Sequence, residues 1–156
     1  MNKSLQKSNN NRKEVISIIS YFFKTESRQF NVEMAFLFGS WARGYPKIDS
    51  DIDIAVCFKN KQLSDTKLFE IITEIALRLS EKLKKEVSVI PIDEDFRKPM
   101  LYYNAVVFGV PVYIKNVESY NRLRFEAIKQ MEDFSIFGLD WQLQGAKEIL
   151  EELEHA

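Results

Sequence analysis

The sequence predicts an α/β fold of the α+β kind, in which a small mixed β-sheet is flanked by helices. Stretches with helical spacing of apolar residues alternate along the chain with short apolar runs typical of strands. The first two of these runs, residues 32–38 and 51–58, are too close together for a full crossover helix, so the sheet is expected to be mixed. A chain of 156 residues is long enough to bury a core without disulfides or a structural metal.

The N-terminal part of the chain is expected to be a tail followed by a helix and a strand. Residues 1–11 are rich in Asn, Ser and Lys, which predicts a flexible, solvated tail. A helix over residues 12–23 is predicted by apolar residues at helical spacing, which are Val15, Ile18, Ile19, Phe22 and Phe23. The apolar run at residues 32–38 then predicts a central strand.

The next segment combines a short turn with a second strand. Residues 40–43 predict a short helical turn, and the Gly-Tyr-Pro sequence that follows predicts a loop. Residues 51–58 predict a strand with Ile52, Ile54 and Val56 on one face. The other face then carries Asp51, Asp53, Ala55 and Cys57.

The remainder of the chain alternates helices with two further strands. A helix capped by Ser64 or Asp65 carries an apolar stripe from Leu68 to Leu83 and is followed by a strand at residues 87–90, which Pro91 ends. The later segments are a helix near residues 98–108, an edge strand at 112–114, and two helices at 119–134 and 140–154.

These elements predict one domain over residues 12–115 and a C-terminal helical extension over residues 116–156 that packs on the same domain. Phe134, Phe137 and Trp141 lie around the expected break between the last two helices. They are interpreted as packing contacts of helices that fold back. The alternative is an apolar patch for a partner protein or a second copy of the chain.

Composition excludes several classes of protein. The net charge of −1 gives no global field that would attract nucleic acid or a membrane. Cys57 is the only cysteine and His155 the only histidine, which argues against a disulfide framework, a cysteine zinc site and histidine-based nucleophilic catalysis. There is no signal peptide and no apolar run long enough to span a bilayer, so a cytoplasmic location is expected.

Gly39 and Ser40 follow the first predicted strand directly and open the short helical turn. Glycine lets an anion approach the backbone because no Cβ intervenes, and free backbone N–H groups and the serine hydroxyl can donate to phosphate oxygens. The alternative is that Ser40 only caps the turn. Arg43 could reach a bound triphosphate, as could Lys47, and Tyr45 could stack on a base; the alternatives are solvated cations and a packed ring.

Asp51 and Asp53 are two residues apart and project from the same face of the second predicted strand. Two neighbouring carboxylates repel each other, and a Mg²⁺ ion, which prefers hard oxygen ligands, relieves that repulsion. The alternative is a solvated turn that also includes Asp49. Together with the Gly-Ser turn, the pair is the equipment of phosphoryl or nucleotidyl transfer, whereas no P-loop motif is present.

The stretch FLFGSWARGYPKIDSDIDIAV, residues 36–56, resembles the signature of the polymerase-β-type nucleotidyltransferases, specifically the minimal nucleotidyltransferase (MNT) group. The stretch LYYNAVVFGVPVYI, residues 101–114, is similar to the helix-Gly-strand segment that closes such domains. The resemblance therefore covers residues 32–114. It implies that Gly39 and Ser40 hold the triphosphate of a nucleotide and that Asp51 and Asp53 bind Mg²⁺.

The resemblance also implies a biological role. Small members of this family often act as antitoxins that pair with a helical HEPN-domain toxin, an RNase. Many of them inactivate the toxin by transferring AMP from ATP to one of its tyrosines. The resemblance therefore implies ATP as substrate, a HEPN toxin as partner and a possible homo-oligomer.

One position departs from the family pattern. A third carboxylate usually lies on the next strand, where this chain has Ser88. That acid completes the metal shell and can help to deprotonate the acceptor hydroxyl. Glu86 lies on the same strand face as Ser88 and Asp93 lies just past the strand, so either could substitute.

Two functions from different classes follow. The first is a Mg²⁺-dependent enzyme that adenylylates a partner toxin. The second is a catalytically weakened antitoxin that neutralises its partner by binding alone, which the serine at position 88 favours. A third, an antibiotic-modifying nucleotidyltransferase, usually carries an additional substrate-binding domain for which this chain is too short.

Overall fold

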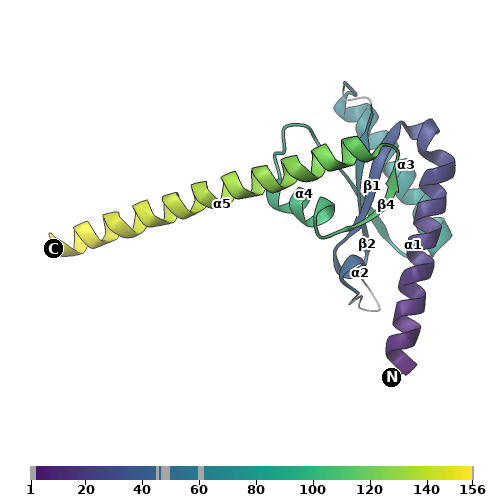
Figure 1. The fold of residues 1–156 in the computed structure, drawn as a ribbon, viewed down its shortest axis with the longest axis horizontal. Helices are drawn as coiled ribbons and strands as arrows, with labels where there is room; N and C mark the ends of the chain where they lie inside the picture. The colour runs from purple at the N-terminus through teal and green to yellow at the C-terminus, as the bar shows by residue number, and fades with distance from the viewer. Residues whose placement is uncertain (1–2, 45, 47–49, 60–61, 156) are drawn as a thin grey trace.

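The structure is a computed structural model that describes residues 3–44, 46, 50–59 and 62–155. Helices and strands alternate along most of the described chain (Figure 1). In order, they are α1 (Lys3–Phe30), β1 (Val32–Phe38), α2 (Ser40–Arg43), β2 (Ile52–Phe58), α3 (Asp65–Leu83), β3 (Val87–Pro91), α4 (Pro99–Val106), β4 (Val110–Ile114) and α5 (Val117–Glu154). The predicted α/β fold class is confirmed, and each predicted strand is present.

The four strands form one sheet in the order β3-β2-β1-β4. Strand β1 is antiparallel to both β2 and β4, whereas β2 and β3 are parallel and are joined through α3. The sheet is therefore mixed, as the short connection between β1 and β2 predicted. Strand β4 lies at an edge, as expected, and β3 lies at the other edge.

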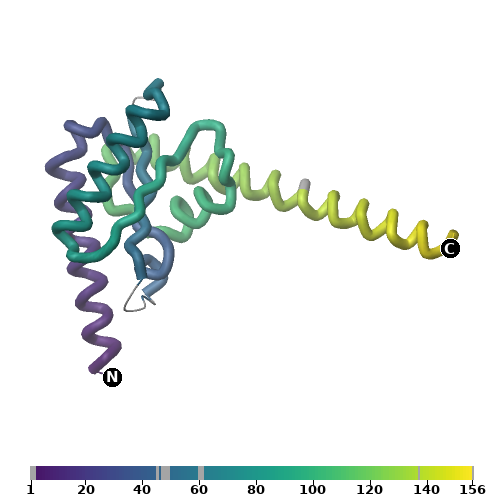
Figure 2. The backbone as a smooth tube through the Cα atoms, turned by 180° about the vertical axis from the view of Figure 1, so that it is seen from behind, coloured from purple at the N-terminus to yellow at the C-terminus, as the bar shows by residue number. Residues whose placement is uncertain are grey.

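Helices cover both faces of the sheet (Figures 1 and 2). Helices α1 and α3 pack on the face to which Ile52, Ile54 and Val56 contribute. Helix α4 and the first turns of α5 pack on the other face, to which Ala55 and Cys57 contribute. The predicted alternation along β2 is confirmed, and it places Asp53 on the α4 side of the sheet.

The first helix is longer than predicted. Helix α1 begins at Lys3, so residues 3–11 are its first turns and the prediction of a separate tail is wrong for them. Its buried residues begin only at Val15, and the preceding side chains are mostly exposed. Once a helix is held by a buried face, it extends at little cost through residues 3–14, which include neither Pro nor Gly. The polar composition of residues 3–11 predicted a tail because it does not show this support from the buried part of the helix.

The C-terminal prediction is also wrong. Helix α5 is one continuous helix of 38 residues, without a break between residues 134 and 140. Gly138 lies inside this helix. A glycine within a helix lowers its stability by only about 1 kcal/mol relative to alanine, so it does not end the helix by itself. Its second half extends away from the sheet instead of folding back (Figures 1 and 2). Neither α5 nor any other helix in the described ranges is long and apolar enough to cross a membrane.

Candidate active site

The turn after β1 is built on two glycines with positive φ. Gly39 has φ 76° and ψ −154°, a conformation that glycine adopts most readily, and α2 begins at the next residue. The Arg43 N–H donates to the Gly39 carbonyl oxygen at 3.2 Å. Gly44, at φ 81°, ends α2 in the left-handed conformation. Gly39, not Ser40, is the N-cap, and no side chain caps α2, so the simpler interpretation of Ser40 as a capping residue is wrong.

The carboxylate of Asp53 lies directly against Gly39. Asp53 pairs with Phe38, the last residue of β1, across the antiparallel ladder. A Cβ added at Gly39 would lie 2.5 Å from Asp53 Oδ2, closer than real Cβ contacts come. The missing side chain of Gly39 therefore provides the space that this carboxylate occupies, and the turn and β2 meet at one point.

The charge of Asp51 acts on the neighbouring Asp53 carboxylate. Asp51 immediately precedes β2 and is exposed, and Asp53 is partly buried. Burial, and after it the charge of Asp51, raises the pKa of Asp53. A divalent cation fits this pair for two reasons. The positive charge of the cation would offset the effects that disfavour the ionised Asp53 carboxylate, and carboxylate oxygens are the ligands that Mg²⁺ prefers.

Ser88 is the residue that the family resemblance predicts at the position of the third carboxylate. Ser88 pairs directly with Asp53 across the parallel β2–β3 ladder and is exposed. Glu86 is exposed one residue before β3, and its carbonyl oxygen accepts from the Ile52 N–H at 2.9 Å. Within the described ranges, no cluster of three or more Asp, Glu, His or Cys side chains could hold a metal ion. Asp49, Tyr45 and Lys47 lie outside the described residues.

Asp93 does not join this site. It lies five residues beyond Ser88, which at about 3.3 Å per strand residue is roughly 16 Å along the chain. Its carboxylate accepts hydrogen bonds from the Tyr102 hydroxyl at 2.8 Å and from Arg97 Nε at 3.2 Å. The proposal that Asp93 substitutes for the third acid is therefore wrong, because this side chain ties the loop after β3 to α4.

The hydrogen bonds of Asp93 also shift two pKa values. Burial by itself would raise the pKa of Asp93, but the hydrogen bonds from Tyr102 and Arg97 and the charge of Arg97 outweigh it and lower the pKa. Burial, together with the hydrogen bond to Asp93, raises the pKa of Tyr102 to about 12. This pair is a structural contact at the end of the sheet opposite Asp51.

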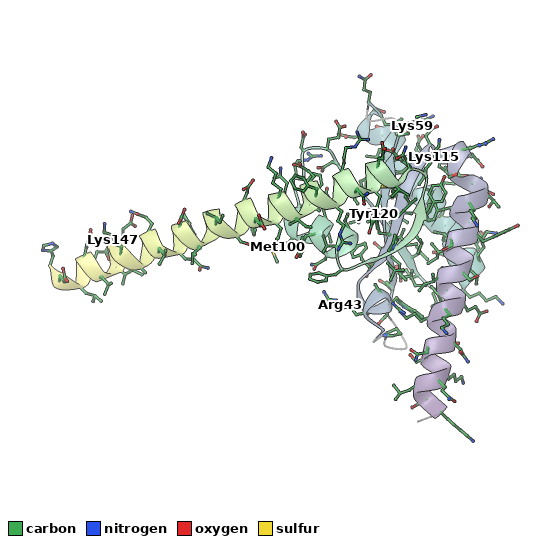
Figure 3. The ribbon with its side chains drawn as sticks, in the orientation of Figure 1. Arg43, Lys59, Met100, Lys115, Tyr120 and Lys147 are labelled. Atoms are coloured by element: carbon green, nitrogen blue, oxygen red, sulfur yellow. The ribbon has the colours of Figure 1, made fainter. Side chains whose placement is uncertain are left out.

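A pocket of about 430 Å³ opens beside the Gly-Ser turn. It is lined by Phe38, Gly39, Ser40, Arg43, Leu101 and Asn104. Arg43 extends from α2 (Figure 3), so the pocket combines a guanidinium, a hydroxyl and an amide with two apolar side chains. Such a lining suits a phosphate-bearing ligand with an apolar part. Sequence analysis missed Asn104, because only the tertiary packing of α4 brings it to the turn.

A hydrogen-bond network around Trp41 joins the turn to its surroundings. The buried Trp41 donates from Nε1 to the Ser50 carbonyl oxygen at 3.2 Å, one residue before Asp51. Arg12 donates from Nε to the Trp41 carbonyl oxygen at 2.9 Å and from Nη2 to that of Ala42 at 2.7 Å. Helix α1, the turn and the segment that leads to Asp51 are thereby tied together. This role of Arg12 and Trp41 could not be predicted from the sequence, because it depends on tertiary contacts that span 29 and 30 residues for Arg12 and nine for Trp41.

Comparisons with known structures support the fold. A toxin–antitoxin complex with AMP-PNP contains a chain with TM-score 0.63 and 18% identity, over 80% of this chain and 96% of that chain. The MntA–HepT toxin–antitoxin gives TM-score 0.59 at 16% identity, over 85% and 97% of the two chains. A tri-AMPylated Shewanella oneidensis HEPN toxin in complex with its MNT antitoxin gives TM-score 0.57 at 16% identity, over 88% and 97%. At these identities the likeness establishes a shared fold.

The sequence comparison is consistent with this. No curated protein matches the chain. The family model for polymerase beta nucleotidyltransferases matches residues 17–118. That range is more than half of the chain and includes the Gly-Ser turn, Asp51, Asp53 and the pocket beside the turn. The chain therefore belongs to the polymerase β nucleotidyltransferase family.

Proposed function

We propose that this protein is an antitoxin that transfers AMP from ATP to a tyrosine hydroxyl of a partner HEPN toxin. One observation carries the proposal: the Asp53 carboxylate lies in the space left by Gly39, beside the pocket that Ser40 and Arg43 line. Membership of the nucleotidyltransferase family and a fold shared with MNT antitoxins solved in toxin complexes support it.

Each residue has a defined part in this proposal. Asp51 and Asp53 would hold Mg²⁺, which when bound neutralises charge on the phosphates of ATP. The Ser40 hydroxyl and the Arg43 guanidinium bind phosphate oxygens and orient the nucleotide. Gly39 keeps the turn close to Asp53, so that the nucleotide and the carboxylates meet.

The proposed reaction is a single displacement at the α-phosphorus of ATP. A bond forms between the tyrosine oxygen of the partner and the α-phosphorus, and the bond from that phosphorus to the bridging oxygen breaks. Pyrophosphate leaves with the electron pair of the broken bond. Since Ser88 cannot accept the proton as a carboxylate would, the tyrosine proton passes to water at the exposed edge of β3.

The test uses the protein encoded by the neighbouring gene as acceptor. The two proteins are incubated with ATP and Mg²⁺, and the intact mass of the acceptor is measured. We expect a gain of one or more adenylyl groups, which Asp53→Asn abolishes and Asp95→Asn, a matched change of an exposed loop acid, leaves intact. No added mass with the wild-type protein, while an active relative modifies its own partner, would contradict the proposal.

A second candidate is an antitoxin that neutralises its partner by contact alone. The serine that pairs with Asp53 favours this candidate, because a site with two acids lacks the usual third metal ligand. Neutralisation of the toxin by the Asp53→Asn variant in growing cells, at the wild-type level, would support binding alone. Loss of neutralisation by a correctly folded Asp53→Asn variant would favour the enzyme.

A further inference from the structure

The second half of α5 has no packing partner within the described part of the chain. Tyr120 stacks on Phe36 of the sheet with ring centroids 5.9 Å apart, and Ala127 is the last fully buried residue of the helix among the side chains that the structure describes. From residue 132 onward, every described side chain except those of the two glycines is exposed. This half projects from the domain (Figures 1 and 2), although its large apolar residues would be buried in an ordinary surface helix.

Most of the exposed apolar residues from Ile136 onward follow a heptad pattern, and Trp141 and Ile149 lie off it. Alternating steps of three and four residues place one stripe on a single side of the helix, here called the seam: Ile136, Leu139, Leu143, Ala146, Leu150 and Leu153. Leu143 is 60% exposed and Leu150 62% exposed. Such spacing is typical of a helix that packs lengthwise against another helix.

The seam continues into a pocket at the edge of the domain. A cavity of about 440 Å³ between α4 and α5 is lined in part by Tyr103, Ile128 and Ile136. Ile136 belongs to both the pocket and the seam. A bound helix could therefore lie along the seam and insert a side chain into a pocket that the folded domain provides.

Charge decides between the kinds of occupant. Residues 132–154 contain seven acidic side chains, and Lys147 (Figure 3) is the one base among them. Two copies of this helix would bring like charges together, and nucleic acid or an anionic membrane would be repelled. The basic start of α1 in a second copy would not match the seam either. Its one exposed large apolar residue before Arg12 is Leu5, which is too little to form an apolar strip. An occupant with an apolar strip and basic flanks matches both features.

We propose that residues 132–153 of α5 form the docking helix of this protein, and that its seam binds an amphipathic helix of the partner toxin whose apolar strip is flanked by lysines and arginines. The inference rests on the proposed function in assuming that a toxin partner exists, but it does not require adenylyl transfer. It assigns partner binding to a part of the chain far from Asp51 and Asp53.

The test compares two neighbouring substitutions that add the same charge. Leu143→Asp lies on the seam, whereas Gln144→Asp lies about 100° away around the helix at a position that is also exposed. Affinity for the protein encoded by the neighbouring gene is measured by titration calorimetry at two salt concentrations. We expect Leu143→Asp to weaken binding by about 30-fold or more and Gln144→Asp by less than about threefold. Binding by the wild type should also weaken as salt rises.

Three results would count against the docking proposal, and a fourth separates it from the proposed enzyme activity. Equal effects of the two substitutions, or no salt dependence, would overturn it, as would the absence of binding by the wild-type protein. Light scattering of the protein alone identifies the other occupant: a dimer that Leu143→Asp dissociates would assign the seam to a second copy. Failure of adenylyl transfer with seam-dependent binding intact would reject the proposed enzyme and leave the docking proposal standing.

Discussion

At the scale of single residues, the contact between Gly39 and Asp53 connects the two halves of the candidate site. The positive φ of Gly39 turns the chain at the end of β1, and its missing side chain leaves room for the Asp53 carboxylate. These are two separate requirements for glycine at one position. Gly44 meets only the first, because no atom of the described residues, its chain neighbours aside, lies within 4 Å of a Cβ added there.

The two glycines therefore make a matched pair of substitutions. Gly39→Ala and Gly44→Ala should each lower the free energy of unfolding by about 1–2 kcal/mol, because both residues have positive φ. Only Gly39→Ala should displace Asp53, and we predict a loss of about 10–100-fold in affinity for Mg²⁺–ATP. Calorimetric titration of both variants checks this. Equal affinities would show that the contact with Asp53 has no role in binding.

Ser88 provides a second prediction at this scale. It pairs with Asp53 across the β2–β3 ladder. If this is the position of the family's third carboxylate, as we propose, Ser88→Asp should supply a base and a metal ligand. We predict that the rate of adenylyl transfer rises by about 10²-fold, which is the lower end of the usual contribution of a general base. Ser88→Asn, which has nearly the same shape without the charge, is the control. A rate that is unchanged or lower in Ser88→Asp would reject this role for the position.

At the scale of elements, Asp93 holds the loop after β3 to α4 through the Tyr102 hydroxyl. We predict that Tyr102→Phe lowers the free energy of unfolding by about 1.5 kcal/mol at neutral pH, because it removes a hydrogen bond to a charged group. Unfolding by urea across pH measures this difference. Adenylyl transfer at neutral pH should be unaffected, since the pair lies away from the turn.

The pH dependence of that difference follows from the two pKa shifts. The lowered pKa of Asp93 stabilises the fold above 3.8, its ordinary value, and this contribution is lost as pH falls further. The raised pKa of Tyr102 stabilises the fold below 10.0, and this contribution is lost as pH rises toward about 12. The difference between wild type and Tyr102→Phe should therefore be largest between these limits. A difference that does not change with pH would mean that the hydrogen bond is not the cause.

Helix α1 stabilises the turn through Arg12. Its guanidinium caps the carbonyl oxygens of Trp41 and Ala42. We predict that Arg12→Met costs about 1.5 kcal/mol of stability and raises the KM for ATP, because α2 loses its support. Lys13→Met, a change at the exposed neighbouring position, is the control and should alter neither quantity. An unchanged KM in Arg12→Met would show that the turn holds its position without α1.

Elements with a buried face could be predicted from the sequence, whereas the exposed ends of helices could not. The bounds of β1 and the alternation along β2 follow from apolar residues that must face the core. The start of α1 at Lys3 and the continuity of α5 involve mostly exposed residues, for which no burial pattern exists. Gly39, Ser40 and Asp53 could be predicted as neighbours because they lie at the end of one strand and the start of the next. The exclusion of Asp93 required the register of β3.

At the scale of the whole molecule, the sheet supports two separate surfaces. Its turn and its two aspartates form the candidate active site, and α5 carries an exposed apolar seam well beyond the domain (Figures 1 and 2). The separation of the seam from the candidate active site suits an enzyme whose substrate is a folded protein. The docking helix can hold the partner while a side chain of the partner reaches the active site. Docking would raise the effective concentration of the partner's tyrosine at the active site, and with it the rate of the proposed adenylyl transfer.

The claim on which the account depends is that Asp51 and Asp53 share a divalent cation whose nucleotide is held by the Gly39–Ser40 turn. Crystals grown with Mn²⁺ and a non-hydrolysable ATP analogue test it through the anomalous signal of manganese. The account predicts a peak within coordination distance of both carboxylates, with the phosphates of the analogue against Gly39 and Ser40. A peak elsewhere, or a nucleotide bound away from the turn, would contradict it.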